Sequence, residues 1–251
     1  MKVYDWTVEI KKTDNYVYPE HFRSAWDDFT MCIPAWKSYL TKKYKGKDNL
    51  QFLELGTAQG RATVWLLEEI LTGKNCNIIT VDANIEQSAK VTGNSLINKA
   101  FEQIEYELKS KNENLSELSK VTSQKDWWDN RENVEIVYNV VNNLAPYIEK
   151  KSCTFYNLKT SEFFNQFNTS EPIFDFVYID ASHNPEDVIF DAINSFRYLK
   201  TGGMMIFDDY WWGKCRVGID CFIETHREFL DSHLETFRDY QMIVGKTKDL
   251  Q

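Results

Sequence analysis

Three carboxylates and one histidine follow short apolar runs in the second half of the sequence. Asp180 ends one such run, His183 comes three residues later, and Asp208 and Asp209 end the next run. If these runs are neighbouring parallel strands, the carboxylates meet at one sheet edge, where they repel unless a cation or protons neutralise them. Mg²⁺ prefers carboxylate oxygens as ligands, and an imidazole can accept a proton near neutral pH. The spacing therefore indicates a divalent metal site beside a general base.

The same residues also have structural interpretations. His183 could cap a helix or be solvated, and Asp208 and Asp209 could be solvated residues of a turn. The aromatic run Tyr210-Trp211-Trp212, together with Trp127-Trp128, could form the wall of a pocket for an acceptor ring. Such aromatic residues could equally pack a sheet edge or a subunit contact. From these residues alone, both interpretations are open.

A glycine-containing turn in the first half, Glu54-Leu55-Gly56-Thr57-Ala58-Gln59-Gly60, joins an apolar run to a helical stretch. The backbone of such a turn can approach a ligand closely. Asp82 ends the next apolar run, where its carboxylate can accept hydrogen bonds from both hydroxyls of a ribose. Ala58 stands where Gly-x-Gly-x-x-Gly has its middle glycine, which disfavours a dinucleotide. A plain strand-to-helix connection, with Asp82 as a cap or turn residue, is the alternative.

Periodicity identifies the elements that must position these residues. From residue 51 onward, short apolar runs alternate with helical stretches, as in a mostly parallel sheet with crossover helices. The predicted strands are residues 52–55, 78–81, 153–156, 174–179, 204–207 and 241–246. The predicted helices are residues 62–71, 134–148 and 185–199, the last of them closed by Gly202-Gly203. This order predicts an α/β fold whose parallel strands end at one ligand-binding edge.

Two regions fall outside this alternation. Residues 20–44 have helical spacing and predict one or two helices within an N-terminal extension, residues 1–50, ahead of a main domain at 51–251. Residues 84–129, which include an amphipathic stretch at 96–108, form an insertion after the second strand, because a crossover needs only about a dozen residues. Since this insertion leaves from the ligand-binding edge, we expect it to form a lid or a dimer contact.

The turn from Glu54 to Gly60 resembles motif I of the class I S-adenosylmethionine-dependent methyltransferases. Residues 51–82, 153–212 and 241–246 together resemble metal-dependent small-molecule O-methyltransferases of the macrocin and mycinamicin sugar group. The resemblance implies a Rossmann-like, doubly wound, mostly parallel seven-stranded sheet, with S-adenosylmethionine and Mg²⁺ as cofactors. It implies His183 as the base and Asp180, Asp208 and Asp209 as metal ligands. It implies cofactor contacts at Glu54, Gly56, Thr57, Ala58, Gly60, Asp82, Thr160, Ser161 and Asp180.

One departure from the family pattern lies after the third strand. Lys159 stands where such methyltransferases often carry an acid, so this chain lacks an acid to contact the adenine there. Thr160 and Ser161 are then the polar residues left to face the adenine.

Composition limits the class of partner. A net charge of −9 disfavours nucleic acid, and no stretch approaches the roughly 20 apolar residues of a membrane span. The five cysteines are scattered and lack a Cys-x-x-Cys pair, which fits a reducing cytoplasm. We therefore expect a cytoplasmic protein that acts on a small molecule, with a homodimer as a possible assembly.

The expected activity is Mg²⁺-assisted transfer of a methyl group from S-adenosylmethionine to a hydroxyl of a sugar or another vicinal diol. Three alternatives remain open: a metal-independent O- or N-methyltransferase, a nicotinamide-dependent oxidoreductase on a similar sheet, and a binding module without activity. A metal titration distinguishes the expected activity from the metal-independent methyltransferase. Comparing the binding of S-adenosylhomocysteine with that of NAD distinguishes it from the oxidoreductase, and a test for turnover distinguishes it from the inactive binding module.

Overall fold

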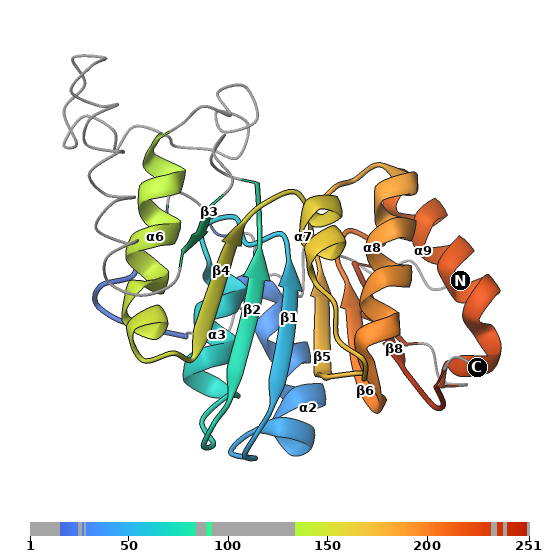
Figure 1. Cartoon of the computed structure of the whole chain (residues 1–251), viewed down its shortest axis with the longest axis horizontal. Coiled ribbons are helices and arrows are strands. Elements are labelled where there is room, and N and C mark those ends of the chain that lie inside the picture. The colour runs from blue at the N-terminus through green and yellow to red at the C-terminus, as the bar shows by residue number, and fades with distance from the viewer. Residues whose placement is uncertain are drawn as a thin grey trace, which may run out of the picture.

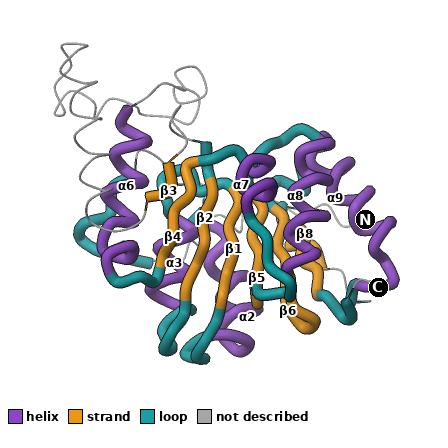
Figure 2. Tube along the Cα trace, in the orientation of Figure 1, coloured by secondary structure: helices purple, strands orange, loops and turns teal. Residues whose placement is uncertain are grey.

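One sheet runs through the molecule, with helices on both of its faces (Figure 1). The computed structural model describes residues 16–24, 27, 29–83, 89–91, 134–231, 235–237 and 240–249. Figure 2 shows the strands as a central layer between the helices. Among the described helices, none is both long enough and apolar enough to cross a membrane.

The order across the sheet is β3-β4-β2-β1-β5-β6-β8-β7. The strands are β1 (Gln51–Leu55), β2 (Asn77–Val81), β3 (Ala89–Val91), β4 (Cys153–Asn157), β5 (Phe174–Ile179), β6 (Leu199–Phe207), β7 (Glu235–Phe237) and β8 (Gln241–Gly245). The five inner strands from β4 to β6 are parallel, and β3, β8 and β7 pair antiparallel at the two sides. The chain runs outward from β1 through β2 to β4 and then returns to β5. The direction of winding therefore reverses between β1 and β5, as in a doubly wound fold.

This arrangement confirms the predicted mostly parallel, doubly wound sheet, and the number of strands differs from the expected seven. Six of the described strands have five residues or more, and the three-residue strands β3 and β7 extend the sheet at its two edges. The six long strands were all predicted, because each is an apolar run buried on both faces. The two short strands carry no such run.

The helices are divided between the faces of the sheet. They are α2 (Ile33–Tyr44), α3 (Arg61–Glu69), α6 (Val134–Glu149), α7 (Thr160–Gln166), α8 (Pro185–Tyr198) and α9 (Gly213–His226), with short 3-10 turns at Thr30–Cys32 and Arg227–Phe229. One buried cluster joins α2, α3 and α6 to strand residues such as Phe52 and Tyr178. A second joins α7, α8 and α9 to the alternate residues, such as Leu53 and Val177. Successive strand residues face opposite sides, so each face has its own core.

The boundary between α8 and β6 corrects one prediction. The helix ends at Tyr198 and the strand begins at Leu199, so Gly202 and Gly203 lie within β6 and do not close the helix. Gly202 has a φ of +81° and donates its N–H to the Lys246 carbonyl at 2.8 Å. A Cβ at Gly203 would lie 2.6 Å from a methyl carbon of Leu199. Gly202 therefore supplies a left-handed backbone conformation, and Gly203 allows a close approach inside the sheet.

The N-terminal helix begins later than its periodicity predicted. Residues 20–24 are not helical, and α2 starts at Ile33 with Pro34 in its first turn, where proline fits a helix. Trp36 of α2 is fully buried and lies edge-on to Tyr178 of β5, with ring centroids 4.7 Å apart. The insertion predicted at 84–129 lies outside the described residues, apart from 89–91, and so do its stretch 96–108 and Trp127-Trp128.

Candidate active site

A cavity of about 800 Å³ opens at the carboxyl ends of the strands, where the winding reverses between β1 and β5. Doubly wound sheets bind ligands in the crevice at this position. The cavity brings together most of the residues predicted from sequence. Its lining includes Gly56, Ala58, Asp82, Thr160, Ser161, Asp180, His183, Asp208 and Asp209. Glu54, Thr57 and Gly60 do not line it.

The turn after β1 passes very close to β5. A Cβ at Gly56, where φ is +89°, would lie 1.8 Å from the backbone oxygen of Asp180, so only glycine fits there. Ala58 adopts a φ of +44°, which is a left-handed conformation that glycine adopts more readily. Gly60 has a φ of +81° at the start of α3. The turn thus keeps its tight course even though alanine replaces the middle glycine.

Asp82 holds this turn in place. Its Oδ2 accepts hydrogen bonds from the backbone N–H groups of Thr57 at 2.8 Å and Ala58 at 2.7 Å. The carboxylate also lines the cavity at the end of β2, as the ribose role requires. The sequence pattern predicts only the ribose role, since the contact with the turn depends on β1 and β2 being neighbours.

Glu54 faces the interior of the protein. It is 1% exposed, and its carboxylate accepts hydrogen bonds from the hydroxyls of Thr80, at 2.5 Å, and Thr63. Thr57 shares a further short hydrogen bond with Thr80. Glu54 therefore ties β1 to α3 and β2 under the turn. Its predicted contact with a cofactor stays a prediction.

The first turn of α7 forms another part of the cavity wall. Lys159, Thr160 and Ser161 all line the cavity, next to Leu158 at the end of β4. The Lys159 backbone N–H donates to the carboxylate of Glu162 at 3.1 Å, which fixes the start of the helix. Thr160 and Ser161 thus border the cavity, and their predicted contact with an adenine stays a prediction.

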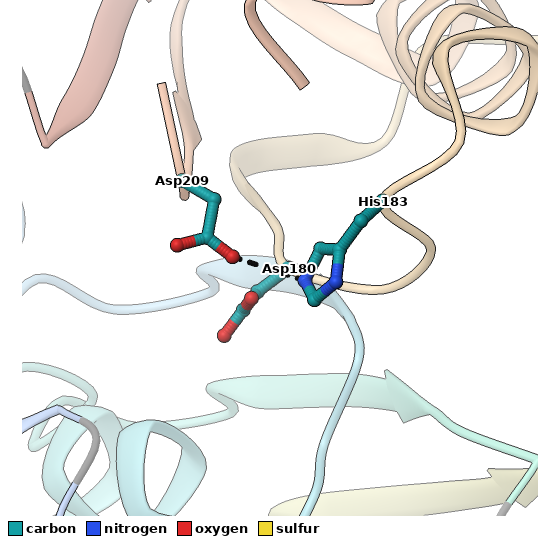
Figure 3. A group of neighbouring side chains, drawn as sticks. All are labelled: Asp180, His183 and Asp209. Atoms are coloured by element: carbon teal, nitrogen blue, oxygen red, sulfur yellow. Dashed lines mark ion pairs between the residues drawn. The ribbon is translucent and has the colours of Figure 1, made fainter. Parts of the chain in front are cut away.

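Asp180, His183 and Asp209 also line the cavity, and they form a compact group (Figure 3). His183 Nε2 lies 3.0 Å from Asp209 Oδ2. One ligand atom from each of the three residues lies within 4.8 Å of the other two. Two carboxylates at this spacing suit a hard divalent cation, and the imidazole is the weaker ligand for Mg²⁺. The described residues thus fit the predicted metal, with His183 left available for proton transfer.

Asp208 is separated from this group, although it borders the same cavity. It is 8% exposed, and its Oδ1 accepts a hydrogen bond from Gln241 Nε2 at 2.8 Å. Its Oδ2 accepts one from the Tyr178 hydroxyl at 3.1 Å. Burial and the neighbouring charge of Asp209 raise the pKa of Asp208 to about 7. Its predicted role as a third metal ligand stays a prediction.

Aromatic side chains flank His183 on the solvent side. The Trp212 ring centroid lies 4.6 Å from that of His183, and Trp211 stacks against Trp212 and Tyr240 at 6.5 Å and 6.4 Å. The Trp211 and Trp212 indoles remain 56% and 39% exposed. Among the described residues, none covers these two indole rings completely, so a ligand could pack against them. Tyr240 lines the cavity and was not predicted, because it comes from a segment without a motif.

The chain matches a family model described as a methyltransferase domain over residues 53–210. A proposed rRNA-methylase from Clostridium thermocellum is 11% identical, with 86% of this chain and 96% of that chain covered and a TM-score of 0.53. MycE methyltransferase of the mycinamycin pathway, solved with Mg, SAH and mycinamycin VI, is 13% identical, with 91% and 52% covered and a TM-score of 0.51. At these identities the solved structures establish the fold. A search of curated proteins finds no match.

Proposed function

This chain belongs to the methyltransferase-domain family, and from that membership we propose that it methylates a hydroxyl of a small molecule with the help of Mg²⁺ and His183. The methyl donor of this S-adenosylmethionine-dependent enzyme would lie along the turn after β1. A sugar or another vicinal diol is the proposed acceptor. The family match favours methyl transfer over the nicotinamide-dependent alternative.

One observation supports the proposal above all. The group of Asp180, His183 and Asp209 opens into the same cavity as the Gly56 turn, so a donor and a deprotonating site share one space. Methyl transfer needs the acceptor oxygen in line with the methyl carbon and the leaving sulfur, with its proton removed. Both requirements can be met within the cavity.

The cofactor is proposed to lie between the first two strands and α7. Asp82 would receive the ribose hydroxyls, and Thr160 or Ser161 would face the adenine. The reaction group consists of Asp180, His183 and Asp209. Asp180 would connect this group to the donor, since its backbone lies close to Gly56 and its side chain belongs to the group. The sulfonium of the donor is positive, so the acidic wall of the cavity favours its binding.

His183 is proposed as the general base. A neutral imidazole that donates its Nε2 hydrogen to Asp209 leaves Nδ1 as the basic nitrogen. The acceptor hydroxyl would give its proton to His183 while its oxygen forms a bond to the methyl carbon. The bond from that carbon to sulfur breaks, and S-adenosylhomocysteine leaves. When bound between Asp180 and Asp209, Mg²⁺ would lower the pKa of acceptor oxygens that it contacts.

A His183→Asn variant tests the base. We expect its kcat on an accepted diol to fall by about 100-fold, because general base catalysis contributes roughly this factor. Its affinity for S-adenosylhomocysteine, measured by calorimetry, should stay within about twofold of wild type, since the imidazole belongs to the acceptor side. His226→Asn is the matched control, because His226 stacks on Phe222 of α9, and it should keep full activity. Undiminished methyl transfer by His183→Asn would exclude the base assignment.

Removal of divalent cations tests the metal. We expect activity to disappear in chelator and to return with added Mg²⁺. Full activity in chelator would instead favour a metal-independent enzyme in which His183 and Asp209 act as a hydrogen-bonded pair. Methylation of an amine and not a hydroxyl on a panel of acceptors would favour the N-methyltransferase alternative.

A further inference from the structure

A buried chain of hydrogen bonds leads from the N-terminal helix to the reaction group. Trp36 Nε1 of α2 donates to Gln241 Oε1 at 2.8 Å, and Gln241 Nε2 donates to Asp208 Oδ1 at 2.8 Å. The Tyr178 hydroxyl lies 3.1 Å from both Asp208 Oδ2 and Asp180 Oδ2. Trp36 and Gln241 are fully buried, and Tyr178 is 2% exposed. Residues distant in sequence thus converge on the two carboxylates.

Trp36 and Asp208 together determine the orientation of the Gln241 amide. An indole N–H can only donate, so it requires the oxygen of the amide on its side. The amide NH₂ group must then face Asp208, whose carboxylate accepts from it. Without the indole N–H, the amide oxygen would lose its donor, and only its repulsion from the Asp208 carboxylate would keep the NH₂ group on that side.

Asp208 is thereby fixed on both sides. Gln241 occupies one of its oxygens, and the Tyr178 hydroxyl contacts the other. The single hydroxyl proton of Tyr178 can be donated to one carboxylate at a time, so the hydrogen bond from Gln241 to Asp208 leaves Tyr178 able to serve Asp180. Asp180 in turn belongs to the group with His183 and Asp209. A disturbance at Gln241 would therefore reach the reaction group through two shared hydrogen bonds.

We propose that Gln241, oriented by Trp36, is a positioning residue that fixes Asp208 and, through Tyr178, the carboxylate of Asp180 that receives the metal. This inference depends on the proposed function in one respect only, which is the presence of the metal. Partners that hold metal ligands in place typically change metal affinity or activity by about 10- to 100-fold when they are removed. A merely structural role for the buried amide would change stability and leave metal affinity unchanged.

The experiment measures the binding of Mn²⁺ to the full-length protein by electron paramagnetic resonance, with S-adenosylhomocysteine affinity measured in parallel. Gln241→Leu keeps the approximate volume and removes both hydrogen bonds, and we expect it to bind Mn²⁺ about 10- to 100-fold more weakly than wild type. Trp36→Phe keeps a ring in the core and removes the N–H, so it should weaken Mn²⁺ binding in the same direction. S-adenosylhomocysteine affinity should stay within about twofold in both variants.

Ser195→Ala is the matched control, because it removes another fully buried polar atom, on α8, away from this chain of contacts. It should bind Mn²⁺ as wild type does. Wild-type Mn²⁺ affinity in Gln241→Leu would overturn the inference. If Gln241→Leu does not fold, wild-type Mn²⁺ affinity in Trp36→Phe would overturn it instead.

A wild-type protein that binds no Mn²⁺ would contradict the metal in the proposed function and not the positioning role. Crystal structures of wild type and Gln241→Leu would then test the positioning role. The inference expects the Asp208 and Tyr178 side chains to move in the variant, and unchanged positions of both would overturn it.

Discussion

Replacement of Asp191 by asparagine should stabilise the protein at neutral and alkaline pH. Asp191 lies on α8 with no exposed surface, and neither carboxylate oxygen makes a hydrogen bond of normal length to the described residues. Burial raises its pKa from 3.8 to about 7, and the charge of Asp187 adds to the effect, while the nearby Thr160 hydroxyl partly offsets it. The folded protein therefore holds this carboxyl in its neutral form far more readily than the unfolded chain does.

The sign and size of the effect follow from these pKa values. As pH rises from about 4 to about 7, the unfolded chain loses this proton while the folded protein keeps it, so the free energy of unfolding falls across that window. A difference of about 3 pKa units corresponds to at most about 4 kcal/mol, and relaxation of the protein around the charge would reduce it. Asparagine has nearly the same shape and never ionises, so at pH 8 the variant should be more stable by roughly 2–4 kcal/mol.

Urea unfolding of wild type and Asp191→Asn at several pH values between 4 and 8 measures this difference. The two proteins should have similar midpoints near pH 4 and diverge toward pH 8, with unchanged m-values. Asp208 titrates in the same window in both proteins, so its contribution cancels in the comparison. Glu186→Gln is the control, since it removes an exposed carboxylate from the same helix and should change stability by no more than about 0.5 kcal/mol. Equal or lower stability of Asp191→Asn at pH 8 would refute the reasoning.

Three further predictions concern the cavity. Gly56→Ala should abolish S-adenosylhomocysteine binding in calorimetry or prevent folding, because its Cβ would lie 1.8 Å from the Asp180 carbonyl oxygen, and wild-type affinity would contradict the close approach. Asp82→Asn should weaken S-adenosylhomocysteine binding by about 10-fold or more in the same assay, since a neutral amide holds the Thr57 and Ala58 N–H groups less strongly, and unchanged binding would count against its role. Trp212→Ala should raise the KM for the acceptor by about 10-fold with S-adenosylhomocysteine affinity unchanged, because the indole lies beside His183; the opposite pattern would place it on the cofactor side.

The positions of the elements with strong periodicity could be predicted from the sequence. The six long strands are continuous apolar runs, and α3, α6 and α8 have a clear apolar stripe, so their positions were predicted to within a few residues. Helix α7 is only seven residues long, and α9 contains an internal glycine at Gly218, so neither has a strong pattern. The end of α8 was misplaced because paired glycines usually end a helix, whereas here Gly202 adopts a positive φ and Gly203 lies close to Leu199, both inside a strand.

The inward direction of Glu54 could have been recognised from sequence. Residues of a strand alternate between the two faces, so Glu54 shares the face of Phe52, on the side of α3, and not the face of Leu53 and Leu55. That alternation directs a carboxylate into the core, where Thr63 and Thr80 supply the hydroxyls that it needs. The presence of these hydroxyls could not be foreseen, because it depends on how α3 and β2 pack.

The same alternation explains why two adjacent aspartates have different surroundings. Asp208 follows β6 on the side of Ile206, which packs with α2, and there it meets Gln241 and Tyr178. Asp209 has a φ of +53°, and this turn brings its carboxylate to His183. A linear motif presents the pair as two equivalent metal ligands. The folded chain instead has one aspartate that contacts His183, the proposed base, and another that is held by the core. Substitution of Asp209 should therefore affect catalysis more directly than substitution of Asp208, whose loss should also destabilise the fold.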